Sequence, residues 1–200
     1  MKFILGKKIG MSQIFDEKGN VIPLTWIKAG PCFVVQIKKE GEDRYNAIQL
    51  GFLKKKSQKI KKSEKGKGYK YLRECRNLRL EDQELRIGDK IDASIFSEGG
   101  IVKISGVSKG KGFQGVVKRW GFAGAPKTHG TKHTLRKPGS IGQQGVERVL
   151  KGKRMAGRMG GGRVTVKNLK IIKVDKNKNL IAVRGAVPGA KGTLLEIQSD

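Results

Sequence analysis

One segment limits what this chain can fold into more than any other. Residues 105–163 contain 14 lysines and arginines, 15 glycines, two histidines and a single acidic residue, Glu147. Such a segment buries too little apolar surface to offset the entropy that the chain loses on folding, so we expect it to be disordered or loosely held in the free protein. The sequence predicts a globular part made of residues 1–105 and 163–200, with residues 105–163 emerging as a long, basic, glycine-rich central extension.

The rest of the chain is typical of short strands separated by turns. Apolar residues there are β-branched or aromatic, or they alternate with polar ones, which predicts half-buried strands. No long segment shows helical periodicity, and strands do not alternate with helices. This pattern predicts a mainly β fold and a small β-barrel. The predicted strands are residues 21–27, 33–37, 46–50, 90–96, 101–104, 164–169 and 180–183.

The formal net charge is +27, and self-repulsion at that charge favours a polyanionic partner. A membrane partner would require an amphipathic helix or a long apolar span, and the sequence has neither. The apolar stretch within residues 1–8 is too short for a signal peptide, so we expect a cytoplasmic protein. Cys32 and Cys75 stand far apart, which favours a reducing compartment and ordinary packing roles for both.

A second basic segment lies within the predicted globular part. Residues 54–70 contain nine lysines and one acid, Glu64. The segment is either a solvated surface excursion or a phosphate-contacting one, and the sequence leaves both open.

Two motifs in residues 105–163 resemble sites that the rest of the sequence does not support. Gly110, Gly112 and Gly115 match the spacing of a dinucleotide-binding loop, but no acid follows before Glu147 to bind a ribose. We therefore expect no nucleotide cofactor, and we expect the glycines to let the backbone approach phosphate. His129 and His133 lack the further ligands of a zinc site and any nearby carboxylate that would orient a general base. The sequence thus predicts neither a metal site nor catalysis, and we expect both histidines to stack on bases or contact phosphate.

Aromatic residues are interleaved with cations in the same segment. Phe113, Trp120 and Phe122 could stack on unpaired bases while the cations hold the RNA backbone. Alternatively, Val116, Val117 and Trp120 form one face of a short helix packed on the barrel. Both interpretations stay open for Trp120.

A basic, hairpin-like arm is expected around a turn at residues 138–142, with limbs at residues 127–137 and 148–158. Cations alternate with small residues from Lys151 to Arg158, which suits a chain passing through a narrow RNA crevice. The candidate RNA-contacting residues, including two uncharged ones at the tip, are Lys109, Lys111, Lys118, Arg119, Trp120, Lys127, His129, Lys132, His133, Arg136, Lys137, Gln143, Gln144, Arg148, Lys151, Lys153, Arg154 and Arg158.

Taken together, several ordered motifs resemble the universal large-subunit ribosomal protein L-three family, in its bacterial or organellar form. The resemblance runs from Leu5 to about Leu195 and is weakest over residues 54–88. The motifs are Gly6-Lys-Lys-Ile-Gly-Met11, Ser108-Lys-Gly-Lys-Gly-Phe113, Val117-Lys-Arg-Trp120, Thr128-His-Gly130, Arg136-Lys-Pro-Gly-Ser-Ile-Gly142, Lys151-Gly-Lys-Arg-Met-Ala-Gly157 and Val183-Arg-Gly-Ala-Val-Pro-Gly189.

The resemblance implies a six-stranded barrel like that of translation factors and a loop that runs through ribosomal RNA to the peptidyl-transferase region. It also implies binding near the 3′ end of the large-subunit RNA, a role in early subunit assembly, neighbouring ribosomal proteins as partners, and a place on a cytoplasmic or organellar ribosome. It implies no enzymatic activity, cofactor or small-molecule substrate. Between Gln143 and Leu150 the tip is one residue shorter than in the commoner form, which leaves open whether a tip glutamine is methylated, as in some members.

Two other function classes compete with a ribosomal role. A DNA-compacting architectural protein would require a groove-reading helix or an arm repeated by symmetry, and the sequence predicts no recognition helix. An RNA-modifying enzyme would require a catalytic constellation or a cofactor loop, and neither is predicted. The sequence therefore favours an architectural RNA-binding protein.

Overall fold

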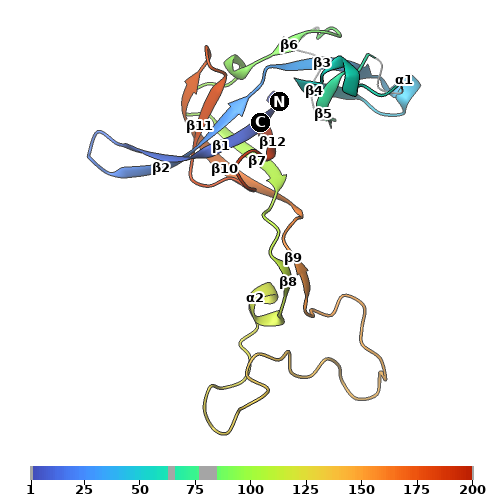
Figure 1. Ribbon diagram of the computed structural model, residues 1–200, viewed down its shortest axis with the longest axis vertical. Coiled ribbons are helices and arrows are strands. Elements are labelled where there is room, and N and C mark those ends of the chain that lie inside the picture. Colours follow the sequence, from blue (N-terminus) through green and yellow to red (C-terminus); the bar gives the residue numbers. More distant parts are fainter. Residues whose placement is uncertain (1, 63–65, 77–84, 200) are drawn as a thin grey trace. The chain divides into compact units, whose positions relative to one another are not determined.

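The structure is a computed structural model that describes residues 2–62, 66–76 and 85–199. The chain divides into two compact units. The first comprises the residues up to Ser108 together with those from Arg163 onward, and the second comprises Lys109–Gly162. Figure 1 shows the elements of both, and each unit is described by itself.

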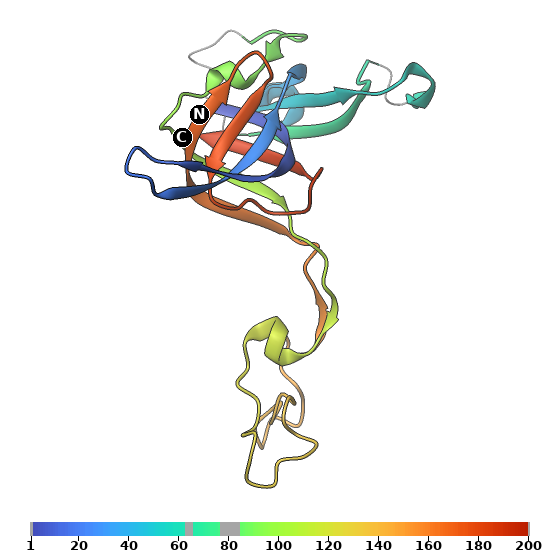
Figure 2. The ribbon, with the colours of Figure 1, turned by 60° about the vertical axis from the view of Figure 1, so that its left-hand side comes forward.

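Six antiparallel strands of the first unit close on themselves as a barrel, in the order β1-β12-β7-β10-β11-β2 (Figure 2). Pairing of β1 with β2, from Gly6 opposite Ala29 to Phe15 opposite Val21, completes the ring. The mainly β fold predicted from the sequence is confirmed, while the likeness to translation-factor barrels stays a prediction. The strands are β1 (Lys2–Phe15), β2 (Val21–Ala29), β7 (Ile101–Val107), β10 (Arg163–Asp175), β11 (Leu180–Arg184) and β12 (Leu194–Ser199).

A second sheet holds strands that the sequence analysis had placed in the barrel. The six barrel positions are filled by other strands, so these segments pair among themselves in the order β5-β4-β3-β6. A short helix, α1 (Glu40–Asp43), and a 3-10 turn, η1 (Ser57–Lys59), lie in the connections. The strands of the second sheet are β3 (Cys32–Lys38), β4 (Ala47–Lys54), β5 (Tyr69–Cys75) and β6 (Lys90–Ile91).

The strand predicted over residues 90–96 is wrong beyond its first two residues. Strand β6 ends at Ile91, and a 3-10 turn, η4 (Ala93–Ile95), follows. The Asp92 carboxylate accepts hydrogen bonds from the Ser94 hydroxyl and the Ser94 backbone N–H, at 2.5 and 3.1 Å. These bonds hold the pKa of Asp92 below its ordinary value. Such a local side-chain bond offers the backbone an alternative to the strand, which polar and apolar alternation does not reveal.

Both sheets of the first unit share one hydrophobic core. Leu5, Ile104 and Leu195 from the barrel belong to the same buried cluster as Leu50 and Phe52 from the second sheet. Because the side chains form one cluster, we expect the two sheets to unfold together. Among the described residues, no helix is long and apolar enough to cross a membrane.

Both cysteines are buried in this core. The Cys32 thiol donates a hydrogen bond to the Leu5 carbonyl oxygen at 3.4 Å, and burial raises the pKa of this thiol to about 12.

We expect Cys32 in the folded protein to react with iodoacetamide at pH 8 roughly three orders of magnitude more slowly than in urea, because only the thiolate is nucleophilic. Peptide mass spectrometry of timed samples measures Cys32 and Cys75 separately. Equal labelling of Cys32 with and without urea would show that the thiol is accessible in the folded state.

Candidate nucleic-acid interface

The second unit, residues 109–162, contains little regular structure. Strands β8 (Gly112–Gln114) and β9 (Gly157–Met159) pair antiparallel, with Phe113 opposite Arg158. Helix α2 (Val116–Trp120) follows β8. Val116 is the only buried hydrophobic side chain of this unit, every residue of which the structure describes. The unit therefore has almost no core of its own.

Two glycines permit close approaches within the unit. At Gly160, whose φ is +73°, a Cβ would collide with the Lys109 carbonyl oxygen, so the two chain segments meet closely only because no side chain is present. At Gly157, a Cβ would lie 2.7 Å from Nη1 of Arg119. These glycines allow the close backbone approaches at the ends of the short β8–β9 ladder.

A cluster around Trp120 ties helix α2 to the chain that precedes β9. The Met155 carbonyl oxygen accepts hydrogen bonds from Nη1 of Arg119 at 2.7 Å and from the indole N–H of Trp120 at 2.9 Å. The guanidinium groups of Arg119 and Arg154 lie 4.9 and 5.5 Å from the Trp120 ring centre. Such cation–π contacts and the shared carbonyl hold Trp120 within its own unit. These contacts all lie within the second unit, and Trp120 is still 41% exposed. Packing of the helix on the barrel and stacking on a base therefore both stay predictions.

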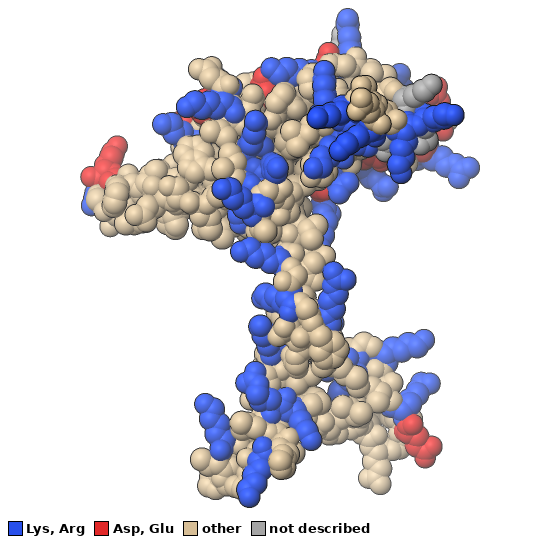
Figure 3. Space-filling model, viewed as in Figure 1, with Lys and Arg blue, Asp and Glu red and all other residues tan. Residues whose placement is uncertain are grey.

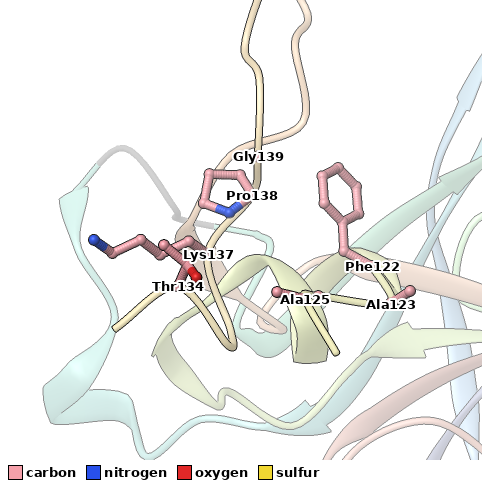
Figure 4. Close-up of a pocket in the computed structure, with 8 residues that line it drawn as sticks. Phe122, Ala123, Ala125, Thr134, Lys137, Pro138 and Gly139 are labelled. Carbon is pink, nitrogen blue, oxygen red and sulfur yellow. The ribbon is translucent and has the colours of Figure 1, made fainter. Parts of the chain in front are cut away.

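The other two aromatics have different surroundings. Phe122 is half-buried and lines a hollow of about 630 Å³ together with Ala125, Lys137 and Pro138 (Figure 4). A backbone hydrogen bond from Ala125 to the Leu135 carbonyl oxygen, 3.1 Å long, joins the two chain segments beside the hollow. Phe113, by contrast, is 77% exposed on the β8–β9 ribbon, opposite Arg158. Its ring is the most open of the three.

The predicted arm differs from the observed one in its pairing. The two limbs, residues 127–137 and 148–158, do not pair with each other as strands. All residues of this unit are described, and its only ladder joins residues 112–114 to residues 157–159. The turn at residues 138–142 includes a hydrogen bond from the Ser140 hydroxyl to the Gly142 carbonyl oxygen, 2.8 Å long. Gln143 borders a smaller hollow of about 260 Å³, which is also lined by Ile141, Val146 and Leu150.

The surface of the second unit is strongly cationic. Residues 109–162 contain 13 lysines and arginines and one acid, Glu147, and no ion pair forms among them. Lysine and arginine side chains project along the whole unit in Figure 3. Of the candidate residues, only Arg119 is half-buried. The exposed ones are Lys109, Lys111, Lys118, Trp120, Lys127, His129, Lys132, His133, Arg136, Lys137, Gln143, Gln144, Arg148, Lys151, Lys153, Arg154 and Arg158. Such a surface suits a polyanion.

No group of three or more His, Cys, Asp or Glu side chains in the described part of the chain could hold a metal ion. His129 and His133 are both exposed. Sequence reasoning missed the Met155 carbonyl oxygen as the anchor of the Trp120 cluster, because a backbone acceptor leaves no signal in residue type. Phe113, which the sequence already indicated as a possible base-stacking ring, lies between Lys111 and Lys118 along the chain.

Comparison with known proteins gives a consistent result over nearly the whole chain. A sequence model of the family described as "Ribosomal protein L3" matches residues 54–182. A protein of Desulfitobacterium hafniense, named "Large ribosomal subunit protein uL3", is 49% identical over 199 residues, which cover 97% of this chain and 93% of the relative. Proteins of the same name from Natranaerobius thermophilus and Chloroherpeton thalassium are 48% and 49% identical, and each match covers 98% of this chain and at least 95% of the relative.

Proposed function

Because the chain belongs to the ribosomal protein L3 family, we propose that it is a structural constituent of the large ribosomal subunit and acts there without enzymatic activity. The observation that carries the proposal is the second unit, with 13 cationic residues, one acid and one buried hydrophobic side chain. A segment with so little core and so much charge is stabilised by a polyanion that surrounds it. Large-subunit ribosomal RNA is that polyanion.

The charged and the uncharged candidate residues have different roles in the proposed interface. The exposed lysines and arginines neutralise phosphates where RNA helices converge, and arginine forks can contact phosphate with two hydrogen bonds. Gln143 and Gln144 donate and accept hydrogen bonds near the peptidyl-transferase region, but amides cannot act as general bases near neutral pH. We propose that these glutamines position RNA. The proposal includes binding near the 3′ end of the large-subunit RNA and a role in early assembly.

The competing functions gain no support. Neither the fold nor the relatives favour a DNA-compacting protein. We propose no cofactor, metal, membrane or small-molecule partner. The protein is expected on ribosomes, in the cytoplasm, with ribosomal RNA and neighbouring ribosomal proteins as its partners.

Reconstitution tests the proposed function directly. Purified protein is mixed with transcripts of the 3′ and 5′ thirds of large-subunit RNA, with duplex DNA of equal length as competitor. We expect tight binding to the 3′ transcript that excess DNA does not displace. Equal affinity for DNA and both transcripts would contradict a specific ribosomal role. A second test uses cell lysate in magnesium buffer, in which the tagged chain should sediment with the large subunits.

The free protein should reveal how the two units differ. We expect limited trypsin digestion to cut first within residues 109–160, because this unit buries one hydrophobic side chain while the first unit has a continuous core. Mass spectrometry of the early fragments measures this. Addition of the 3′ transcript should slow these cuts. First cuts within the barrel strands would contradict the expected order.

Phe113 is the aromatic residue best placed to stack on an unpaired base, since its ring is exposed between cationic neighbours. We expect Phe113→Leu to weaken binding to the 3′ transcript by roughly fivefold to a hundredfold, as removal of one base stack does. Phe113→Tyr should bind like the original protein. An equal loss in both variants, or in neither, would show that the aromatic ring does not stack on RNA.

A further inference from the structure

The β1–β2 hairpin extends past the barrel ladder as a two-stranded arm. Strand β1 pairs with β12 only as far as Lys7, and β2 pairs with β11 only from Leu24 onward. Beyond these points the ladder joins only these two strands, down to Phe15 opposite Val21. At the base of the arm the Gly185 N–H also donates a hydrogen bond to the Pro23 carbonyl oxygen at 2.8 Å. We call residues 9–23 the hairpin arm, which is visible beside the labels β1 and β2 in Figure 1.

The charge of the hairpin arm is opposite in sign to that of the chain. Its charged residues are Asp16, Glu17 and Lys18, in a protein with a net charge of +27. Figure 3 shows the arm as a nearly uncharged surface with acidic atoms at its end. Contacts to RNA are made largely to phosphate, by cations and hydrogen-bond donors. The arm is therefore poorly suited to the RNA that the second unit fits.

Three large exposed apolar side chains lie on one face of the arm, with Gln13 between two of them. In the β1–β2 register, Met11 is opposite Thr25, Gln13 opposite Pro23, and Phe15 opposite Val21. Residues two apart on a strand share a face, as do residues directly opposite. Met11, Phe15 and Val21 therefore share a face, and they are 56%, 67% and 52% exposed. Large exposed apolar side chains gathered on one face in this way are typical of a protein interaction site.

The end of the arm is closed by a defined turn. Backbone hydrogen bonds run from Asp16 to the Asn20 carbonyl oxygen at 2.9 Å and from Gly19 to the Asp16 carbonyl oxygen at 2.8 Å. Gly19 has a φ of +76°, a conformation that glycine adopts readily. The turn places the acidic residues beside the apolar face. Since a two-stranded ribbon is only marginally stable in water by itself, a covering partner would stabilise the arm.

We propose that the hairpin arm docks onto a basic protein neighbour in the large subunit. An apolar patch on that neighbour covers Met11, Phe15 and Val21, and its lysine or arginine side chains meet Asp16 and Glu17. The acids and the apolar face select a protein over RNA. A second copy of this chain is disfavoured because two molecules of charge +27 repel one another. The proposal rests on the proposed function, which places the chain in a large subunit.

Photo-crosslinking in assembled large subunits tests the docking. Phe15 is replaced by p-benzoylphenylalanine, subunits containing the variant are purified and irradiated, and crosslinked fragments are identified by mass spectrometry. We expect one major crosslink to a lysine- or arginine-rich segment of another ribosomal protein. The same photoreactive residue at Ile101, an exposed apolar position on strand β7, is the matched control and should not give that crosslink.

Charge reversal then tests the acidic contribution. Asp16→Lys combined with Glu17→Lys should lower the yield of this crosslink by about tenfold, because the introduced lysines repel a basic neighbour. A crosslink mainly to ribosomal RNA, to a second copy of this chain, or to no protein above the Ile101 control would overturn the docking proposal, and so would a yield that charge reversal leaves unchanged. Absence of the chain from purified subunits would overturn the proposed function and this proposal with it. Presence in subunits with a crosslink to RNA would overturn only the docking.

Discussion

Replacing Lys151, Lys153, Arg154 and Arg158 together with glutamine is expected to weaken binding to large-subunit RNA by about a hundredfold at ~100 mM salt and to flatten its salt dependence. All four side chains are exposed on the second unit. Each neutralised phosphate contributes about −0.9 to the slope of log K against log salt on duplex DNA, and folded RNA should follow the same sign. Loss of four contacts should therefore make the slope shallower by about 3.6. Binding titrations across a salt series measure both quantities.

A matched control variant distinguishes the effect of these four positions from the effect of lowering the net charge. Replacing Lys167, Lys170, Lys176 and Lys178 with glutamine removes four exposed cations from the first unit. We expect this control to change the slope by less than about 1. Equal effects of the two variants would indicate that binding follows net charge alone. An unchanged slope in the first variant would show that its four side chains do not contact RNA phosphates. Because Arg154 also lies against Trp120, a triple variant that retains Arg154 shows whether local unfolding contributes.

The β class of the fold could be predicted because β-branched and aromatic residues mark most strands. Segments predicted at residues 21–27, 101–104 and 180–183 lie within strands β2, β7 and β11. Strand β1 escaped prediction, since Gly6, Lys7 and Lys8 interrupt its apolar pattern and a register shift between Lys8 and Gly10 breaks its alternation. The division of the strands between two sheets depends on pairing across the chain, which local periodicity does not specify.

The residue types of the candidate interface could be read from the sequence, but their local roles could not. A lysine-rich and arginine-rich segment almost without acids already predicts a polyanion. Whether Trp120 faces a base or its own unit depends on the Met155 carbonyl oxygen, a group that every residue carries. The hairpin arm could not be predicted from the sequence for a similar reason. The exposure of Phe15 follows from where the pairing of β1 with its barrel neighbour ends, not from residue type.

Phe52→Ala is expected to destabilise the first unit by about 3–5 kcal/mol, as removal of a fully buried aromatic side chain does. Phe52 is fully buried in strand β4, its ring centre lies 6.4 Å from that of Tyr71, and it belongs to the core that both sheets share. Urea denaturation should show a single transition with a lower midpoint and an unchanged slope, because the sheets lose their common core together. Phe113→Ala, at an exposed ring, is the control and should cost less than about 0.5 kcal/mol. Two separate transitions would show that the second sheet unfolds independently of the barrel. In that case the buried contacts between the sheets would contribute little to the free energy of unfolding of either.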